Sequence, residues 1–217
     1  MLLAQERTKL DPTDDALFYE YPRFVTHVDT GFIQQLTNLY SDRLKPKTRI
    51  LDLMSSWVSH LPEGMEFEHI EGHGLNGEEL GRNPRFDHFF VQNLNQNLQL
   101  PLADNQFDAV LNTVSVQYLQ YPDAIFSEIQ RILKPNGVAI FSFSNRMFAQ
   151  KAIQAWRDGS EQKRVELVKS YFNSVKGFSV PEAVISGSKP SVNFWDWLNP
   201  ASGDPFYAVI ATKISTT

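Results

Sequence analysis

The stretch from Phe107 to Ser144, FDAVLNTVSVQYLQYPDAIFSEIQRILKPNGVAIFSFS, constrains the fold more than any other part of the chain. It opens with β-branched and aromatic residues after an Asp-Asn turn, which is typical of a strand. From Pro122 the apolar residues follow helical spacing, and the run GVAIFSFS after the KPNG turn predicts a second strand. Two apolar strands joined by a helix predict parallel neighbours in a sheet that helices cover on both faces.

The rest of the chain repeats this alternation of strands and helices. Further strands are predicted at Arg49–Met54, Phe67–His73, Phe86–Gln92, Phe178–Ile185 and Phe206–Ile214. Further helices are predicted between Ala16 and Leu44, with Asp29 and Thr30 as N-cap candidates, and at Met147–Arg157 and Glu161–Phe172.

Two connections restrict the topology. About a dozen residues separate Leu53 from Phe67, which is close to the minimum for a crossover between parallel strands, so we expect a very short crossover helix there. The last two strands have no convincing helix between them, which predicts an antiparallel hairpin at one sheet edge. Trp195 and Trp197 alternate ahead of the last strand, and we expect them to pack on that edge.

Composition narrows the functional classes. The 217 residues suffice for one well-buried domain, and we expect a single domain over residues 1–217. The chain has no cysteine, which excludes disulfides, thiolate zinc sites and cysteine nucleophiles. The first residues do not resemble a signal peptide, and no apolar run approaches the roughly 18 residues of a membrane span. We therefore expect a soluble, cytoplasmic protein that does not bind membranes.

The segment from Leu100 to Arg146 resembles the class I S-adenosylmethionine-dependent methyltransferases, particularly the small type-11-like group. The resemblance is carried by LPL before an Asp-Asn turn, by the Phe-Asp pair that opens a strand, and by the LKPNG turn. It implies a Rossmann-like, doubly wound sheet of seven strands in the order 3-2-1-4-5-7-6, with strand 7 antiparallel. It also implies S-adenosylmethionine lying across the carboxyl ends of strands 1 and 2, at the topological switch point.

The loop after the first strand departs from the family pattern. Asp52 supplies the acidic residue of that strand, but Met54-Ser55-Ser56-Trp57 stands where the family has a glycine-rich loop. Positive φ angles, if the loop needs them, would be strained without glycine. The loop either faces a ligand with Met54, Ser55 and Ser56, or begins a serine-capped helix with Trp57 packed in the core.

The end of the second strand lacks the acid that binds both ribose hydroxyls in the family. Gly74 takes that position, and each lost hydrogen bond to a charged acceptor removes about 1.5–3 kcal/mol. Cofactor binding would weaken about ten- to a thousandfold, unless Asn76, Glu78 or Glu71 substitutes. Glu71 would take the role if the register were shifted by three residues.

Other strand ends supply further candidates for cofactor binding. Asn93 follows the third strand, where its amide oxygen could accept from the adenine amino group or could cap the loop. Leu94 would cover one adenine face. Asn112 and Thr113 end the fourth strand and would flank the methionine portion of the cofactor.

Candidate substrate residues precede the first long helix, in a segment that the resemblance makes a lid within residues 1–45. Tyr21 and Arg23 could hold a carboxylate, and His27 could act as a base. The alternative is an amphipathic lid in which Arg23 pairs with a surface acid and His27 is solvated. Gln117 and Tyr118 are expected at the pocket mouth, with Tyr118 a second catalytic candidate, or in a purely structural role.

Asn145 and Arg146 follow the fifth strand and could position an anionic acceptor, or serve as a helix cap and a surface charge. His69, His73 and His88 lack the spacing of metal ligands, so no metal is expected.

Three functions fit these patterns. The first is a methyltransferase that acts on a small O, N or C nucleophile. The second is a binding or regulatory module of the same fold with weakened or lost cofactor binding, and the third is an enzyme with another nucleoside-type ligand. A net charge of −5 and the absence of an Asn/Asp-Pro-Pro-Tyr/Phe motif argue against a nucleic-acid substrate.

Overall fold

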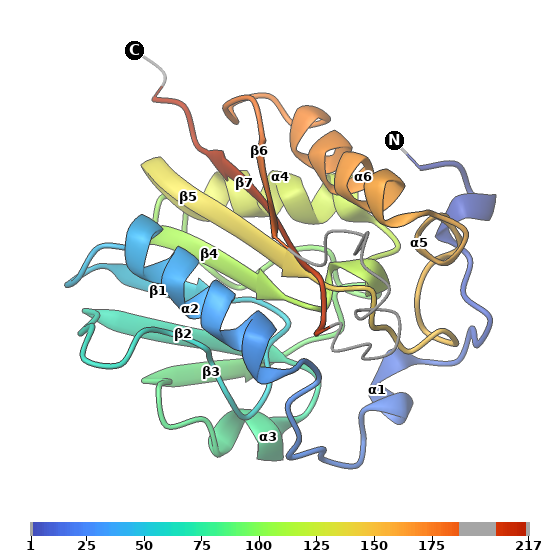
Figure 1. Cartoon of the computed structure of the whole chain (residues 1–217), viewed down its shortest axis with the longest axis horizontal. Helices are drawn as coiled ribbons and strands as arrows, with labels where there is room; N and C mark the ends of the chain where they lie inside the picture. Colours follow the sequence, from blue (N-terminus) through green and yellow to red (C-terminus); the bar gives the residue numbers. More distant parts are fainter. Residues whose placement is uncertain (1, 187–202, 216–217) are drawn as a thin grey trace, which may run out of the picture.

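One seven-stranded sheet organises the computed structural model, which describes residues 2–186 and 203–215 (Figure 1). The order is β3-β2-β1-β4-β5-β7-β6, and β7 runs antiparallel to both β5 and β6. The strands are β1 (Arg49–Asp52), β2 (His69–Gly74), β3 (His88–Val91), β4 (Phe107–Thr113), β5 (Leu133–Phe143), β6 (Glu182–Ser186) and β7 (Phe206–Thr212). This order and the antiparallel β7 confirm the predicted topology.

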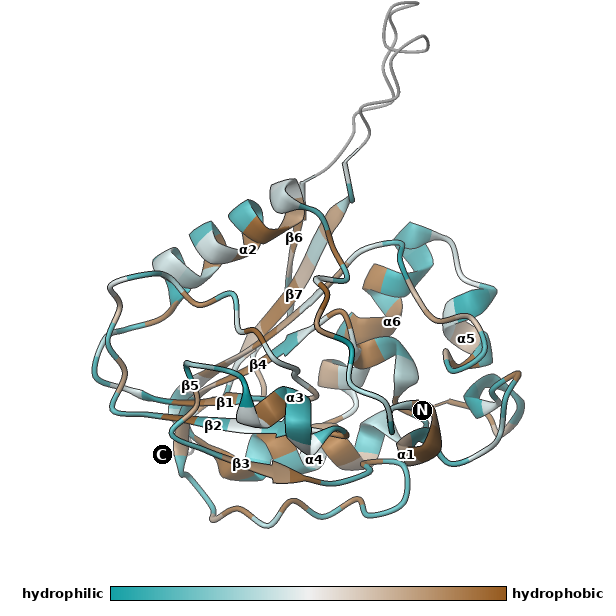
Figure 2. Cartoon of the chain, turned by 90° about the horizontal axis from the view of Figure 1, so that it is seen from below, coloured by the Kyte–Doolittle hydropathy of each residue, from teal (hydrophilic) through white to brown (hydrophobic). Residues whose placement is uncertain are grey.

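Helices lie on both faces of the sheet, as the apolar strands require (Figures 1 and 2). The helical elements are η1 (Gln5–Arg7), α1 (Asp15–Phe18), α2 (Thr30–Arg43), α3 (Gly77–Gly81), η2 (Val116–Tyr118), α4 (Pro122–Ile132), α5 (Gln154–Arg157) and α6 (Glu161–Asn173). Asp29 caps α2, since its carboxylate accepts from the Phe32 N–H at 2.8 Å. Pro122 opens α4, where its missing N–H costs nothing.

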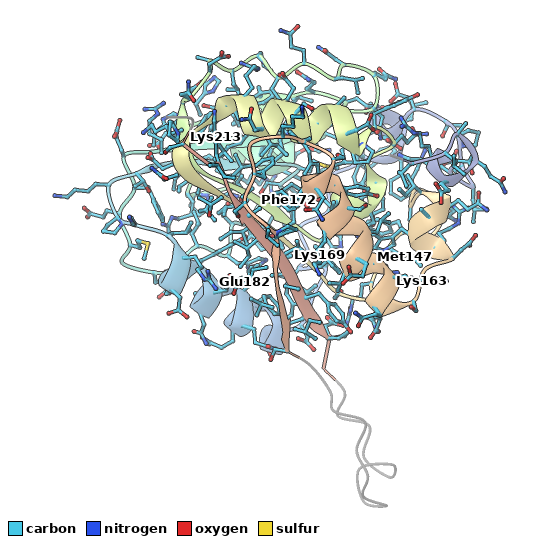
Figure 3. All side chains as sticks on the ribbon, turned by 90° about the horizontal axis from the view of Figure 1, so that it is seen from above. Met147, Lys163, Lys169, Phe172, Glu182 and Lys213 are labelled. Atoms are coloured by element: carbon cyan, nitrogen blue, oxygen red, sulfur yellow. The ribbon has the colours of Figure 1, made fainter. Side chains whose placement is uncertain are left out.

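Alternate strand residues divide the core into two layers. Ile50 faces the α2 side and belongs to a cluster with the buried Phe32 and Leu36 of that helix. Leu51, the next residue, faces the other side and belongs to the larger cluster that holds α4 and α6. Phe172 of α6 packs into this second layer beside β7, while α6 leaves its lysines on the outside (Figure 3).

The prediction of a very short helix after the first strand was wrong. Residues 53–68 contain no helix, and serine side chains do not begin one. Two backbone N–H groups of this loop instead donate to His73 of β2, Met54 to the ring and Ser55 to the carbonyl. The side chain of Trp57 is only half-buried and donates to the Val25 carbonyl of the N-terminal segment, so it does not pack in the core.

Several predicted boundaries also shift. The first strand ends at Asp52, and the helical text from Ala16 to Leu44 forms two helices separated by an irregular segment around Pro22. Only Gln154–Arg157 is helical within the predicted stretch from Met147. The fifth strand begins at Leu133, ahead of the predicted turn, because Leu133 pairs with Phe107 before a register shift.

Trp195 and Trp197 lie outside the described residues. The described helices include none that is both long and apolar enough to cross a membrane.

Candidate functional site

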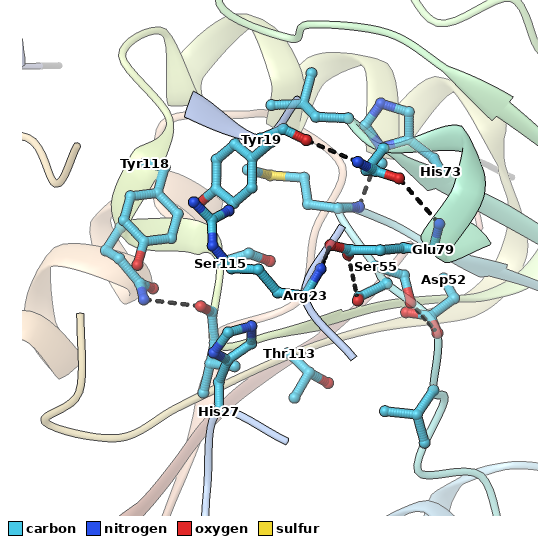
Figure 4. A pocket seen from close by; sticks show the side chains of 18 of the residues that line it. Tyr19, Arg23, His27, Asp52, Ser55, His73, Glu79, Thr113, Ser115 and Tyr118 are labelled. Atoms are coloured by element: carbon cyan, nitrogen blue, oxygen red, sulfur yellow. Dashed lines mark hydrogen bonds between the residues drawn. The ribbon is translucent and has the colours of Figure 1, made fainter. Parts of the chain in front are cut away.

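A cavity of about 630 Å³ opens at the carboxyl ends of the parallel strands, beneath the N-terminal segment (Figure 4). Loops after β1, β2, β3, β4 and β5 line it, together with residues between Asp15 and Val28. Carboxyl ends of parallel strands at a change of winding direction are where α/β sheets bind ligands. The volume falls within the range of about 300–1,000 Å³ typical of small-molecule sites.

Asp52 ends β1 as a buried carboxylate on the cavity wall. Its Oδ2 accepts from the Ser55 hydroxyl at 2.8 Å and from the Ser59 hydroxyl. Burial raises the pKa of Asp52 to about 6, although both serine bonds favour the charged form. Asp52 therefore holds the shape of the loop by binding two of its hydroxyls.

His73 supports the same loop from β2. Its Nδ1 accepts from the Met54 N–H at 3.0 Å, and its Nε2 lies 3.0 Å from the Gln92 carbonyl. The Ser55 N–H donates to the backbone carbonyl of His73 at 2.6 Å. Burial lowers the pKa of His73 to about 4, so the ring is neutral at pH 7 and carries its proton on Nε2.

Two residues with positive φ flank the cavity at the ends of neighbouring strands. Met54 after β1 has φ of 58°, and Val114 after β4 has φ of 45°. The left-handed region is costly for any side chain and most unusual for a β-branched one. The loop thus needs the conformation that glycine adopts freely, and the expected strain is present at Met54.

Gly74 ends β2 on the cavity wall, at the position of the missing acid. A Cβ there would lie 2.5 Å from the carbonyl oxygen of Ser55, so the close approach of the β1 loop leaves no room for a side chain. Glu71 does not line the cavity, because it lies three residues before the end of β2, where its carboxylate contacts His69 and His88. A register shift that brings Glu71 to the site is therefore wrong.

Asn76 and Glu78 are engaged elsewhere. The Asn76 amide oxygen caps α3 by accepting from the Glu78 and Glu79 N–H groups, both at 3.0 Å. Its amide nitrogen donates to the carbonyls of Tyr19 and Glu20. Glu78 pairs with Arg82 on the surface.

Glu79 is the carboxylate that α3 presents to the cavity, and the sequence did not single it out. It is buried, and its Oε2 accepts from the Ser56 hydroxyl at 2.6 Å while its Oε1 accepts from the Arg23 N–H at 2.6 Å (Figure 4). In Asn76-Gly-Glu-Glu, Glu79 occupies the position of a capping-box acid, so the sequence pattern favoured a local role.

The loop after β3 uses its amides to hold the N-terminal segment. Asn93 donates to Asp14 at 2.8 Å and accepts from the Asn95 N–H at 2.9 Å. Both asparagines and the buried Leu94 line the cavity. The loop-capping interpretation of Asn93 thus describes its contacts in the structure.

At the end of β4, Asn112 is buried, donates to the Leu53 carbonyl at 3.0 Å and does not line the cavity. Thr113 does line it, with its hydroxyl 3.1 Å from that of Tyr40. Beyond them, the Ser115 hydroxyl and the Gln117 amide oxygen are buried cavity-lining atoms without a hydrogen-bond partner among the described residues. Buried polar atoms without a partner are rare in folded proteins, so these two are candidate contacts for a bound molecule.

The Tyr118 hydroxyl accepts from the Phe148 N–H at 2.9 Å, which ties η2 to the loop after β5. Asn145 and Arg146 of that loop also line the cavity, and Arg146 pairs with Asp204.

The N-terminal segment closes the cavity. Arg23 and His27 line it, whereas Tyr21 is 76% exposed and does not line it, so Tyr21 is not part of the site. The His27 ring packs edge-on against Phe148, and burial lowers its pKa below the ordinary value. His27 is therefore neutral at pH 7.

A buried charge cluster fastens this segment to the rest of the protein. Lys151 is fully buried, and its Nζ lies 3.0 Å from the Asp11 carboxylate and 2.8 Å from the Thr13 carbonyl. Lys9 pairs with Asp15 at 2.6 Å. No metal-binding group of three His, Asp or Glu side chains occurs in the described part of the chain.

Comparisons with known proteins agree with the topology. A family model described as a methyltransferase domain matches residues 76–141. A 59-residue segment is 39% identical to the biotin biosynthesis bifunctional protein BioHC of Saccharophagus degradans, but it spans 27% of this chain and 11% of that protein.

Two solved structures share the fold at low identity. The crystal structure of the [4+2]-cyclase SpnF superposes with a TM-score of 0.57 and 18% identity, over 84% of this chain and 81% of the cyclase. Phosphoethanolamine N-methyltransferase 2 of Haemonchus contortus, in complex with S-adenosyl-L-methionine, gives a TM-score of 0.57 and 16% identity, over 99% of this chain and 61% of that enzyme.

Proposed function

We propose that the chain is a member of the class I S-adenosylmethionine-dependent methyltransferase superfamily, and that it binds S-adenosylmethionine in the cavity and methylates a small-molecule nucleophile. One observation carries this proposal. The cavity of about 630 Å³ lies at the carboxyl ends of β1, β2 and β4, and residues that line it carry buried polar atoms without a hydrogen-bond partner among the described residues.

The residues at the site fit this cofactor, if Glu79 takes the role of the acid that is missing from the end of β2. The loop from Asp52 to Ser56 keeps the left-handed turn, at Met54, and Gly74 leaves space beside it. The ribose acid is absent from the end of β2, and we assign its role to Glu79, whose oxygens can accept further hydrogen bonds from hydroxyl groups. Leu94 offers an apolar face, and Thr113 and Gln117 offer polar groups.

Catalysis in this arrangement depends on alignment, with a base only where the acceptor carries a proton. When bound, the cofactor supplies an electrophilic methyl group on a positively charged sulfur. His27 is neutral at pH 7 and faces the cavity, so it can take the proton of an O–H or N–H acceptor. Tyr118 holds the loop after β5 and shapes the acceptor side.

The proposal includes a single domain in which the residues up to about 45 form the lid segment. Net charge of −5 favours a small-molecule acceptor over nucleic acid, and the absence of cysteine is consistent with a reducing compartment such as the cytoplasm.

Calorimetry with S-adenosylmethionine and S-adenosylhomocysteine tests the proposal. We expect micromolar dissociation constants for the wild type and a loss of tenfold or more in Glu79→Gln, because a hydrogen bond to a charged acceptor contributes about 1.5–3 kcal/mol. Glu78→Gln is the matched control, since the neighbouring Glu78 lies outside the cavity, and it should bind as the wild type does. Constants no tighter than about millimolar for both ligands in the wild type would refute the proposal.

A second candidate is a binding module of the same fold that does not transfer a methyl group. The Met54 and Ser55 N–H groups bind His73 and are not free for a ligand, which favours this candidate. Fold alone does not decide, since one solved relative is named a cyclase. Micromolar binding of S-adenosylmethionine without release of S-adenosylhomocysteine in the presence of any acceptor would support it.

A further inference from the structure

Arg23 brings a positive charge into the cavity that no carboxylate of the described residues neutralises. Its Nη2 donates to the Phe18 carbonyl at 2.9 Å, whereas its Nη1 is buried and has no hydrogen-bond partner within that part of the chain. The cavity is lined by one other arginine, Arg146, which already pairs with Asp204. An unpaired buried donor on a charged group is costly, so Nη1 is suited to an anionic ligand.

The three carboxylates on the cavity wall are all engaged with other groups. Asp15 pairs with Lys9, and Asp52 accepts from two serine hydroxyls. Glu79 accepts from the backbone N–H of Arg23, and from the Ser56 hydroxyl. None forms an ion pair with the Arg23 guanidinium, so the predicted pairing of Arg23 with a surface acid does not occur among the described residues.

Aromatic rings hold the guanidinium in one orientation. Its central carbon lies 4.7 Å from the Phe18 ring centre, 5.4 Å from that of Tyr19 and 5.5 Å from that of Phe148. Figure 4 shows Arg23 extending across the cavity from Glu79 to the ring of Tyr19. A planar guanidinium fixed in this way matches the planar fork of a carboxylate.

We propose that Nη1 of Arg23 binds a carboxylate of the methyl acceptor, so that the acceptor is a small organic acid with an apolar body. This inference rests on the proposed function. Tyr118 and Phe148, whose rings stack at 27°, provide an apolar wall next to the guanidinium.

The same chemistry is present in the amino-acid carboxylate of the cofactor, which is the other source of such a group. The position of the guanidinium favours the carboxylate of the acceptor over that of the cofactor. It packs on Phe148, which follows β5, while the proposed cofactor loop follows β1, and β4 lies between these two strands.

The first part of the test separates the two carboxylates. S-adenosylhomocysteine and 5′-methylthioadenosine, which lacks the amino-acid portion, are titrated by calorimetry into the wild type and Arg23→Gln. We expect each ligand to bind both proteins within about twofold. A tenfold loss for S-adenosylhomocysteine in Arg23→Gln, with 5′-methylthioadenosine unchanged, would assign Arg23 to the cofactor and overturn the proposal.

The second part tests the acceptor. 4-Hydroxybenzoate and hexanoate, each alongside its carboxamide, are titrated into the protein with and without saturating S-adenosylhomocysteine. We expect at least one acid to bind tenfold or more tightly than its amide, this preference to fall below threefold in Arg23→Gln, and Arg23→Lys to retain part of it. Equal binding of acid and amide in the wild type for both pairs, or an unchanged preference in Arg23→Gln, would overturn the proposal.

Arg82→Gln is the matched control. Arg82 also stacks on an aromatic ring of the N-terminal segment, with its central carbon 4.2 Å from the Phe24 ring centre, but it does not line the cavity. It should leave the acid preference unchanged, and thermal unfolding of all variants verifies that they fold. Failure of the wild type to bind S-adenosylhomocysteine would refute the proposed function alone, because the titrations without it still report on Arg23.

Discussion

Gly74→Ala adds one methyl group where the β1 loop and β2 meet, and the structure indicates that it will not fit. The new Cβ would lie 2.5 Å from the Ser55 carbonyl oxygen and 3.2 Å from a methyl group of Leu80. The Ser55 carbonyl must move by about 0.5 Å to relieve the first contact, and the Ser55 N–H bond to His73 opposes this movement.

The expected loss of stability follows from two opposing effects. Overpacking of this kind costs about 1–3 kcal/mol, and the lower entropy of the unfolded Ala chain returns about 0.4–1 kcal/mol. The free energy of unfolding should therefore fall by about 1–2 kcal/mol, which lowers Tm by roughly 3–6 °C for a domain of this size. Because the loop must shift, S-adenosylhomocysteine binding should weaken as well.

Gly81→Ala is the control for the substitution itself. Gly81 ends α3, and a Cβ there would be 3.7 Å from the nearest atom of Phe89, an ordinary contact. Since alanine favours a helix over glycine by about 1 kcal/mol, this variant should match or exceed the wild type in urea denaturation. If Gly74→Ala were as stable as Gly81→Ala, the close approach of loop and strand would not explain why the acid is missing from β2.

Asp52→Asn should change how stability depends on pH, since Asp52 keeps its proton up to a pKa of about 6 when folded but releases it near 4 when unfolded. Stability is therefore lost as pH rises from 4 to 6. The unfolding free energy of the wild type minus that of Asp52→Asn should fall by roughly 2 kcal/mol between pH 4 and pH 7. A difference that does not change with pH would contradict the raised pKa. Lys151→Met removes the buried cation that binds the Asp11 carboxylate and the Thr13 carbonyl, so it should lower stability and speed limited proteolysis ahead of residue 28. Lys163→Met on the surface is its control, and equal proteolysis of the two variants would contradict a fastening role.

The central part of the fold could be predicted because its local signals agree with its tertiary environment. β4 and β5 bury apolar side chains on both faces, and α4 buries one apolar stripe. Burial of this kind is visible in the sequence as runs or stripes of apolar residues. Between Leu53 and Phe67 the local sequence pattern does not predict the observed conformation. There the backbone is held by the side chain of His73 from another strand, and a single sequence does not record a contact of that kind.

The sequence predicts where the cavity lies in the fold, but it predicts only some of the residues that line it. Strand ends are visible in the sequence, so Asp52, Gly74 and Thr113 fall on the cavity wall as expected. Glu79 was missed because its spacing from Asn76 fits a local helix cap equally well. The Glu79 carboxylate binds Ser56 and Arg23 at the cavity and not the start of its own helix. Because these partners lie far from Glu79 in sequence, a local pattern does not predict the contacts.

The strain at Met54 and Val114 bears on whether the cavity is a functioning site or the remnant of one. Each left-handed residue costs on the order of 1–3 kcal/mol, and a loop released from function could relax to an ordinary conformation or regain glycine. The surrounding contacts instead maintain the strain, through the His73 ring that binds the Met54 N–H and through Asp52, which is buried at the expense of its own charge. Asp52 and His73 both line the cavity, in which the Ser115 hydroxyl and the Gln117 amide oxygen have no hydrogen-bond partner within the described part of the chain. Maintenance of two strained residues at neighbouring strand ends therefore favours a cavity that still binds its ligand.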